Sequence, residues 1–102
     1  MLKEFRQAIF DECVHSEFQI IENDSAVCTL ELTEIIERMK TPEQESFSLL
    51  FLGPLTTFVP QGIRRLRHSS LGDLDIFLVP VGEKKDGFQY EAVFNKLLKP
   101  RE

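Results

Sequence analysis

The stretch DLDIFLVPVGEKKDGFQYEAVFN, residues 73–95, decides the fold of this chain. In its second half, apolar side chains occupy every second position from Phe88 to Phe94. This period of two predicts a strand with one buried face. The first half is apolar on both faces from Leu74 to Val81, which is typical of a strand covered on two sides. Residues 82–87 between the halves are charged and bounded by glycines, and they predict a hairpin loop.

Length and composition predict one packed domain. The chain has 102 residues, of which 42% are hydrophobic and nine are Phe, enough for a core without disulfide or metal support. We expect residues 1–98 to form a single β-barrel-like domain. Residues 99–102 are expected to be a flexible tail.

The charge and the hydropathy exclude several classes of partner. A net charge of −5 disfavours binding to nucleic acid and to anionic membranes. No segment approaches the roughly 18 continuous apolar residues of a membrane span. The first residues also lack the uninterrupted apolar run of a signal peptide, so a cytoplasmic location is expected.

The rest of the chain predicts about six antiparallel strands and one N-terminal helix. Apolar residues at helical spacing indicate a helix over residues 2–13. The alternating patterns and turn residues predict strands at 17–22, 26–33, 46–52, 63–69, 73–81 and 88–95. A resumed strand at 55–59, a short helix or turn at 34–40 and a capped turn starting at Thr41 are further expectations. Such a set forms a small closed or partly open barrel, with a sandwich as the alternative.

Several segments resemble a known family of small bacterial proteins. They are Phe47–Pro54, Gln61-Gly62, His68 three residues before Leu71-Gly72, Phe77–Gly82 and Tyr90–Asn95. The chain from about Phe5 to Asn95 is thereby similar to a domain of unknown function, DUF6916. The family pattern has Tyr where this chain has Arg64. The resemblance implies no reaction, cofactor or catalytic residue. Where the residues leave the function open, the resemblance implies an accessory role beside tail-fibre-like proteins.

No group of residues in the sequence predicts catalysis, a cofactor or a metal. Cys13, His15, Cys28 and His68 form a nominal zinc set, but their spacing does not match the ligand pairs of zinc sites. The two cysteines are predicted to be core thiols rather than nucleophiles. The acidic pairs lie near strand ends, where carboxylates are usually solvated. We therefore expect a protein that is not an enzyme.

The strongest charge feature is the segment that holds Arg64, Arg65, Arg67 and His68. Guanidinium groups grip phosphate and carboxylate groups, so these residues could form an anion or ligand site. On a strand, however, Arg65 and Arg67 share one face, and Arg64 shares the other with His68. The favoured interpretation is cross-strand pairing with Asp or Glu. His68 is expected to be a structural group, hydrogen-bonded near the turn that follows it.

Two functions remain open at this stage. The first is a non-enzymatic protein-interaction or accessory module that docks on another protein or on a second copy of itself. If the N-terminal helix leaves the outer face of Phe77, Val79 and Val81 uncovered, another subunit should cover it. The alternative is a barrel that binds a small anionic ligand through the Arg64–Arg67 strand.

Overall fold

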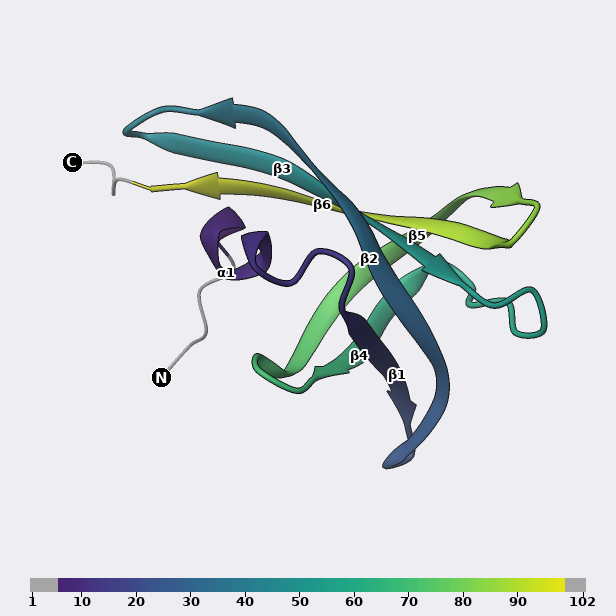
Figure 1. Cartoon of the computed structure of the whole chain (residues 1–102). Helices are drawn as coiled ribbons and strands as arrows, with labels where there is room; N and C mark the ends of the chain where they lie inside the picture. Colours follow the sequence, from purple (N-terminus) through teal and green to yellow (C-terminus); the bar gives the residue numbers. More distant parts are fainter. Residues whose placement is uncertain (1–5, 99–102) are drawn as a thin grey trace.

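The computed structural model describes residues 6–98, which form one short helix and six strands. The strands close into a barrel in the order β1-β2-β3-β6-β5-β4, and every neighbouring pair is antiparallel (Figure 1). The predicted fold class is therefore confirmed. The elements are α1 (Gln7–Asp11), β1 (Glu17–Glu22), β2 (Ser25–Lys40), β3 (Gln44–Gly53), β4 (Gly62–His68), β5 (Gly72–Lys84) and β6 (Gly87–Leu97).

The two strands of the deciding stretch pair with each other as predicted, but the loop between them is shorter. β5 runs on to Lys84, which pairs with Gly87, so that only residues 85 and 86 turn the chain. Gly87 permits a close approach of the two strand ends. A Cβ atom at this position would lie 2.3 Å from the carbonyl oxygen of Gly53, a distance that no side chain tolerates.

The first hairpin also forms as predicted, because its turn residues suit the geometry. Asn23 and Asp24 have φ values of 50° and 64°, in the left-handed region that Asn and Asp tolerate better than most residues. They link β1 to β2 with Glu22 opposite Ser25. Two successive residues with positive φ match the right-handed twist of the paired strands.

The predicted helix or turn at 34–40 is wrong, because β2 continues as a strand to Lys40. Its pairing with β3 shifts register between Leu32 and Glu34 and again between Glu37 and Met39. Each shift inserts one extra residue into β2. These insertions convert the alternation of apolar residues into the three- and four-residue spacing that imitates a helix.

The connections confirm one further expectation and correct another. Thr41 caps the turn that it begins, as predicted, although no helix follows. Its hydroxyl accepts hydrogen bonds from the backbone N–H groups of Glu43 and Gln44, which tightens the β2–β3 turn. Residues 55–59 do not resume a strand. Instead, Val59 is buried, and its N–H group donates to the Tyr90 hydroxyl at 2.9 Å, which fastens this loop to the barrel.

Helix α1 is shorter than the predicted helix over residues 2–13, of which residues 2–5 lie outside the described part. It begins at Gln7, whose N–H group donates to the carboxylate of the buried Glu45. It ends before a turn in which His15 adopts a φ of 71°. Phe10 anchors the helix against Phe47 and Phe94, with ring centroids 6.1 and 5.9 Å away.

The barrel interior is filled by apolar side chains from all six strands. As predicted, Tyr90 and Ala92 of β6 point into it. Phe18 and Phe51 meet edge to face, 5.4 Å apart, near its centre. The other core residues are Phe10, Cys13, Ile20, Leu30, Leu32, Phe47, Leu49, Val59, Leu66, Leu74, Ile76 and Leu78.

Candidate functional site

The segment with the strongest charge feature is β4, and its side chains alternate as predicted. Leu66 and His68 point inward and are buried. Ile63, Arg65 and Arg67 point outward and are exposed. One strand therefore separates a buried set of residues from an exposed set, and each has its own contacts.

The outward arginines form a ladder of ion pairs with β5. Arg65 donates two hydrogen bonds to Asp75, of 3.1 and 3.4 Å, and Arg67 donates two to Asp73, of 2.7 and 3.0 Å. These hydrogen bonds raise the pKa values of both guanidinium groups above their usual range. Paired guanidinium and carboxylate groups neutralise each other, as the interpretation of cross-strand pairing predicted.

Arg64 lies on the other face of β4 and does not join this ladder. Its guanidinium group donates to the carbonyl oxygen of Pro60 at 2.7 and 3.2 Å and lies 3.8 Å from Glu22. The three arginines thus do not form one patch, and the alternation of the sequence predicted this separation.

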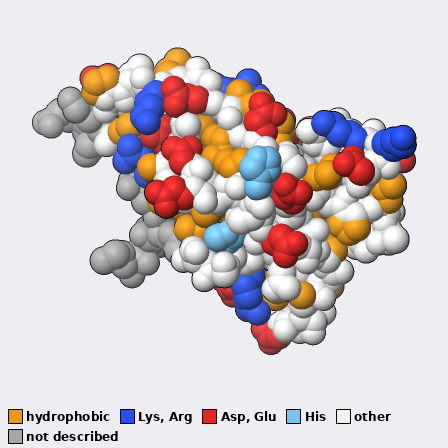
Figure 2. Space-filling model, in the orientation of Figure 1, with side chains coloured by type: hydrophobic (Ala, Val, Ile, Leu, Met, Phe, Trp, Pro, Cys, Tyr) orange, Lys and Arg blue, Asp and Glu red, His pale blue; other side chains and the backbone are white. Residues whose placement is uncertain are grey.

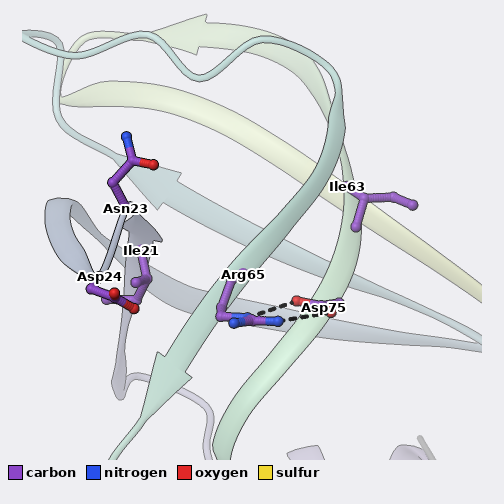
Figure 3. Close-up of a pocket in the computed structure, with 6 residues that line it drawn as sticks. All are labelled: Ile21, Asn23, Asp24, Ile63, Arg65 and Asp75. Atoms are coloured by element: carbon purple, nitrogen blue, oxygen red, sulfur yellow. Dashed lines mark hydrogen bonds and ion pairs between the residues drawn. The ribbon is translucent and has the colours of Figure 1, made fainter.

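A hollow of about 320 Å³ lies beside Arg65, between the β1–β2 turn and the outer faces of β4 and β5 (Figure 3). Its lining combines one guanidinium group with two carboxylates, those of Asp24 and Asp75. The Arg65 guanidinium is directed to Asp75 in this view. An anion entering the hollow would therefore meet a net negative lining.

Beyond the ion pairs, the same outer face becomes apolar. Ile63 lies opposite Phe77 in the β4–β5 ladder, and the two side chains are 71% and 49% exposed. Val81 further along β5 is exposed as well. Helix α1 does not cover this face, because it packs through Phe10 on Phe47 of β3 and Phe94 of β6 instead. The expectation that another subunit covers the outer face of β5 stays a prediction. We call Ile63, Arg65, Asp75 and Phe77 the β4–β5 face.

His68 on the inner side is held by hydrogen bonds, as predicted. Its Nδ1 atom accepts from the backbone N–H groups of Ser70 and Leu71 at 3.0 and 3.2 Å. Its ring lies 4.5 Å from that of Phe18, and the side chain is only 6% exposed. Burial lowers the pKa of the imidazole, because desolvation disfavours the protonated ring.

Sequence reasoning missed the partner of His68, Ser16, because it lies in the turn before β1. Its Oγ atom is 2.8 Å from His68 Nε2, a distance seen in nucleophilic Ser–His pairs. Here, however, Nδ1 accepts hydrogen bonds, so Nε2 carries the proton and donates a hydrogen bond to Ser16 Oγ. The serine hydroxyl in turn donates to the Cys13 carbonyl. His68 therefore joins the two turns and is not placed to take the serine proton.

The cysteines lie apart from any metal-ligand cluster and have raised pKa values. No cluster of three or more His, Cys, Asp and Glu within residues 6–98 could hold a metal ion. Cys13 and Cys28 are both free thiols. Burial raises the pKa of each thiol, and the nearby Glu12 and Glu22 carboxylates act in the same direction. A raised pKa disfavours the thiolate that nucleophilic chemistry requires.

A comparison with known protein families identifies the family to which the chain belongs. A family model described as "Domain of unknown function (DUF6916)" matches residues 5–94. The chain belongs to the DUF6916 family. No curated protein and no solved structure matches it.

The DUF6916 match includes β4, β5 and the partly buried Ser16–His68 contact, so all parts of the candidate site lie within the family domain. The surface of this DUF6916 chain carries interspersed acidic and basic side chains on the face shown in Figure 2. In the described part, no helix is long and apolar enough to cross a membrane.

Proposed function

We propose that this chain is a non-enzymatic interaction module that docks on another protein through the β4–β5 face. The exposed pair of Ile63 and Phe77 carries this proposal. Two apolar side chains that lie opposite each other on a sheet and remain outside the core favour contact with a partner. The paired charges of Arg65 and Asp75 beside them form the polar rim that protein interfaces usually have.

The partner should present a shallow apolar depression bordered by polar groups of both signs. A ladder in which each Arg is already matched by an Asp offers no excess charge to attract a highly charged partner. The apolar pair therefore supplies most of the affinity, and the ladder supplies orientation.

Affinity capture with the tagged chain from a bacterial lysate tests this function. Partners that bind the wild type should be lost from an Ile63→Ser/Phe77→Ser double variant. They should be retained by Met39→Ser, which removes an exposed apolar side chain from the end of β2, outside the β4–β5 face. Recovery of no partner, or equal recovery by all three proteins, would overturn the proposal.

The alternative function is binding of a small anionic ligand through the Arg64–Arg67 strand. The hollow beside Arg65 is its candidate site, and an anion there would have to displace Asp75 from Arg65. A thermal-shift screen with phosphate, citrate and nucleotides tests it. A stabilisation of the wild type that disappears in Arg65→Ala would support this alternative. Equal melting temperatures with and without each anion would remove it.

A further inference from the structure

Three strands continue beyond the barrel as an arm, which consists of the ends of β2, β3 and β6 (Figure 1). β1 pairs with β2 only as far as Glu31, and β5 pairs with β6 only as far as Glu91. β3 lies between the other two and pairs with both. The arm therefore has two borders, one formed by β2 and one by β6, with no further strand beside either in the described part of the chain.

The hydrogen bonds show which backbone groups of β6 face outward. The N–H group of Leu98 donates to the Glu43 carbonyl, so residue 98 faces β3. In an antiparallel ladder, this direction alternates from one residue to the next. The backbone groups of Val93, Asn95 and Leu97 accordingly point away from β3, as those of Glu91 do where it pairs with β5. We call these three residues the β6 edge.

The two borders differ in how they are protected. The β2 border carries two register shifts and four charged side chains, those of Glu34, Glu37, Arg38 and Lys40. Bulges and charges are the usual means by which proteins prevent an edge strand from pairing with another chain. The β6 strand pairs with β3 through ten consecutive residues without a shift, and between 92 and 97 its one charge is Lys96. The β6 edge therefore lacks both protections.

The side chains of the β6 edge also suit pairing with an identical edge. Val93 and Leu97 are 55% and 62% exposed on the outer face. A two-fold axis through Asn95, perpendicular to the sheet, places Val93 opposite Leu97 of a second copy and the two Asn95 residues opposite each other. In this register the outward backbone groups of all opposed residues meet, and each pair exchanges two hydrogen bonds. Lys96 lies opposite Phe94, so no like charges are opposed.

We propose that the β6 edge pairs antiparallel with the β6 edge of a second copy and joins two arms into one continuous six-stranded sheet, two copies of the three-stranded arm. This homodimer goes beyond the proposed function because it uses a different surface from the β4–β5 face. It leaves both β4–β5 faces of the dimer open to partners. α1 packs on the inner face of the arm through Phe10 and contributes no hydrogen bond to the edge.

Disulfide trapping tests the proposed register. Across the two-fold axis, Asn95→Cys brings two thiols to the separation that a disulfide requires. Under mild oxidation, this variant should form a covalent dimer on a non-reducing gel. Met39→Cys, which places a thiol on the β2 border, is the matched control and should stay largely monomeric. Equal trapping of the two variants would overturn the proposal.

Charge substitution on the edge provides a second test, read by light scattering over a range of concentrations. Val93→Lys/Leu97→Lys opposes like charges twice and should weaken the dimer by roughly tenfold or more. Val93→Lys/Leu97→Glu opposes unlike charges in the same register and should restore it. The Ile63→Ser/Phe77→Ser variant should remain dimeric. A monomeric wild type, or a dimer that only this last variant dissociates, would overturn the β6 pairing; the second result would leave the β4–β5 face as the interface.

Discussion

The two faces of β4 differ in how their side chains are bonded and how far they are buried. On the inner face, the polar atoms of His68 are all bonded within the chain, to Ser16 and to the turn after the strand. On the outer face, the charges are paired as well, but the apolar side chains of Ile63 and its neighbour Phe77 remain 71% and 49% exposed. The inner face therefore stabilises the fold, while the outer face exposes apolar surface that a partner can contact.

The largest expected contrast is between the aliphatic residues of the two faces. Leu66→Ala removes a fully buried side chain and should lower the free energy of unfolding by about 2–5 kcal/mol. Ile63→Ala, on the same strand, should change it by no more than about 0.5 kcal/mol. Urea denaturation of both variants measures the difference. Similar losses would mean that Ile63 is packed in solution.

A smaller effect is expected from the hydrogen bonds of the inner face. His68→Phe keeps a ring next to Phe18 but leaves the N–H groups of Ser70 and Leu71 without their acceptor. Both hydrogen bonds are only partly buried, so the loss of each should cost about 0.5–1.5 kcal/mol. A variant as stable as the wild type in urea would show that these bonds contribute nothing net to the fold.

The pH dependence of stability sharpens the same comparison. The pKa of His68 is lower in the folded chain, so below about pH 6.5, the usual value for histidine, the unfolded chain binds more protons. The free energy of unfolding should therefore fall as the pH drops from about 6.5 toward the lowered pKa. Denaturation curves at several pH values measure this slope. In His68→Phe the part of the slope due to this residue should vanish, and an unchanged slope would contradict the assignment.

The smallest effect is expected from the ion pairs of the outer face. Arg65 and Asp75 are exposed, and solvent and salt screen their attraction. Arg65→Ala, Asp75→Ala and the double variant should have urea midpoints that cannot be distinguished from the wild type at about 1 M NaCl. A clear coupling between the two substitutions at that salt concentration would show that the ladder stabilises the fold.

The fold could be predicted from the sequence where the local pattern of apolar residues agrees with the way the strands pair. The alternation of β6 and the turn at Asn23-Asp24 specified two hairpins, and the separation of Arg64 from Arg65 followed from the period of a strand. The interpretation failed in β2, because its two bulges change the alternation of apolar residues into a spacing that a helix shares. The cover of a sheet face could not be predicted either. It depends on where α1 docks, and Phe10 reaches the arm rather than Phe77.

The candidate site was predicted in part. The arginines and the hydrogen bonding of His68 near its turn followed from the sequence, since strand periodicity and turn residues are local. The contact between His68 and Ser16 joins residues far apart in the chain, so no spacing rule could find it. The open β6 edge was missed for the same reason, because an unpaired border exists only once all six strands are arranged.

The barrel is closed by the pairing of β1 with β4, which extends over Gln19–Arg67, Ile20–Leu66 and Ile21–Arg65 and is the shortest ladder of the sheet. Two strands and a long loop separate these partners along the chain. Ring closure must therefore wait until the intervening chain is in place, which makes folding slow compared with hairpin formation. The same short seam should be the first to open in the native state, so its amides should exchange with deuterium sooner than those between β3 and β6.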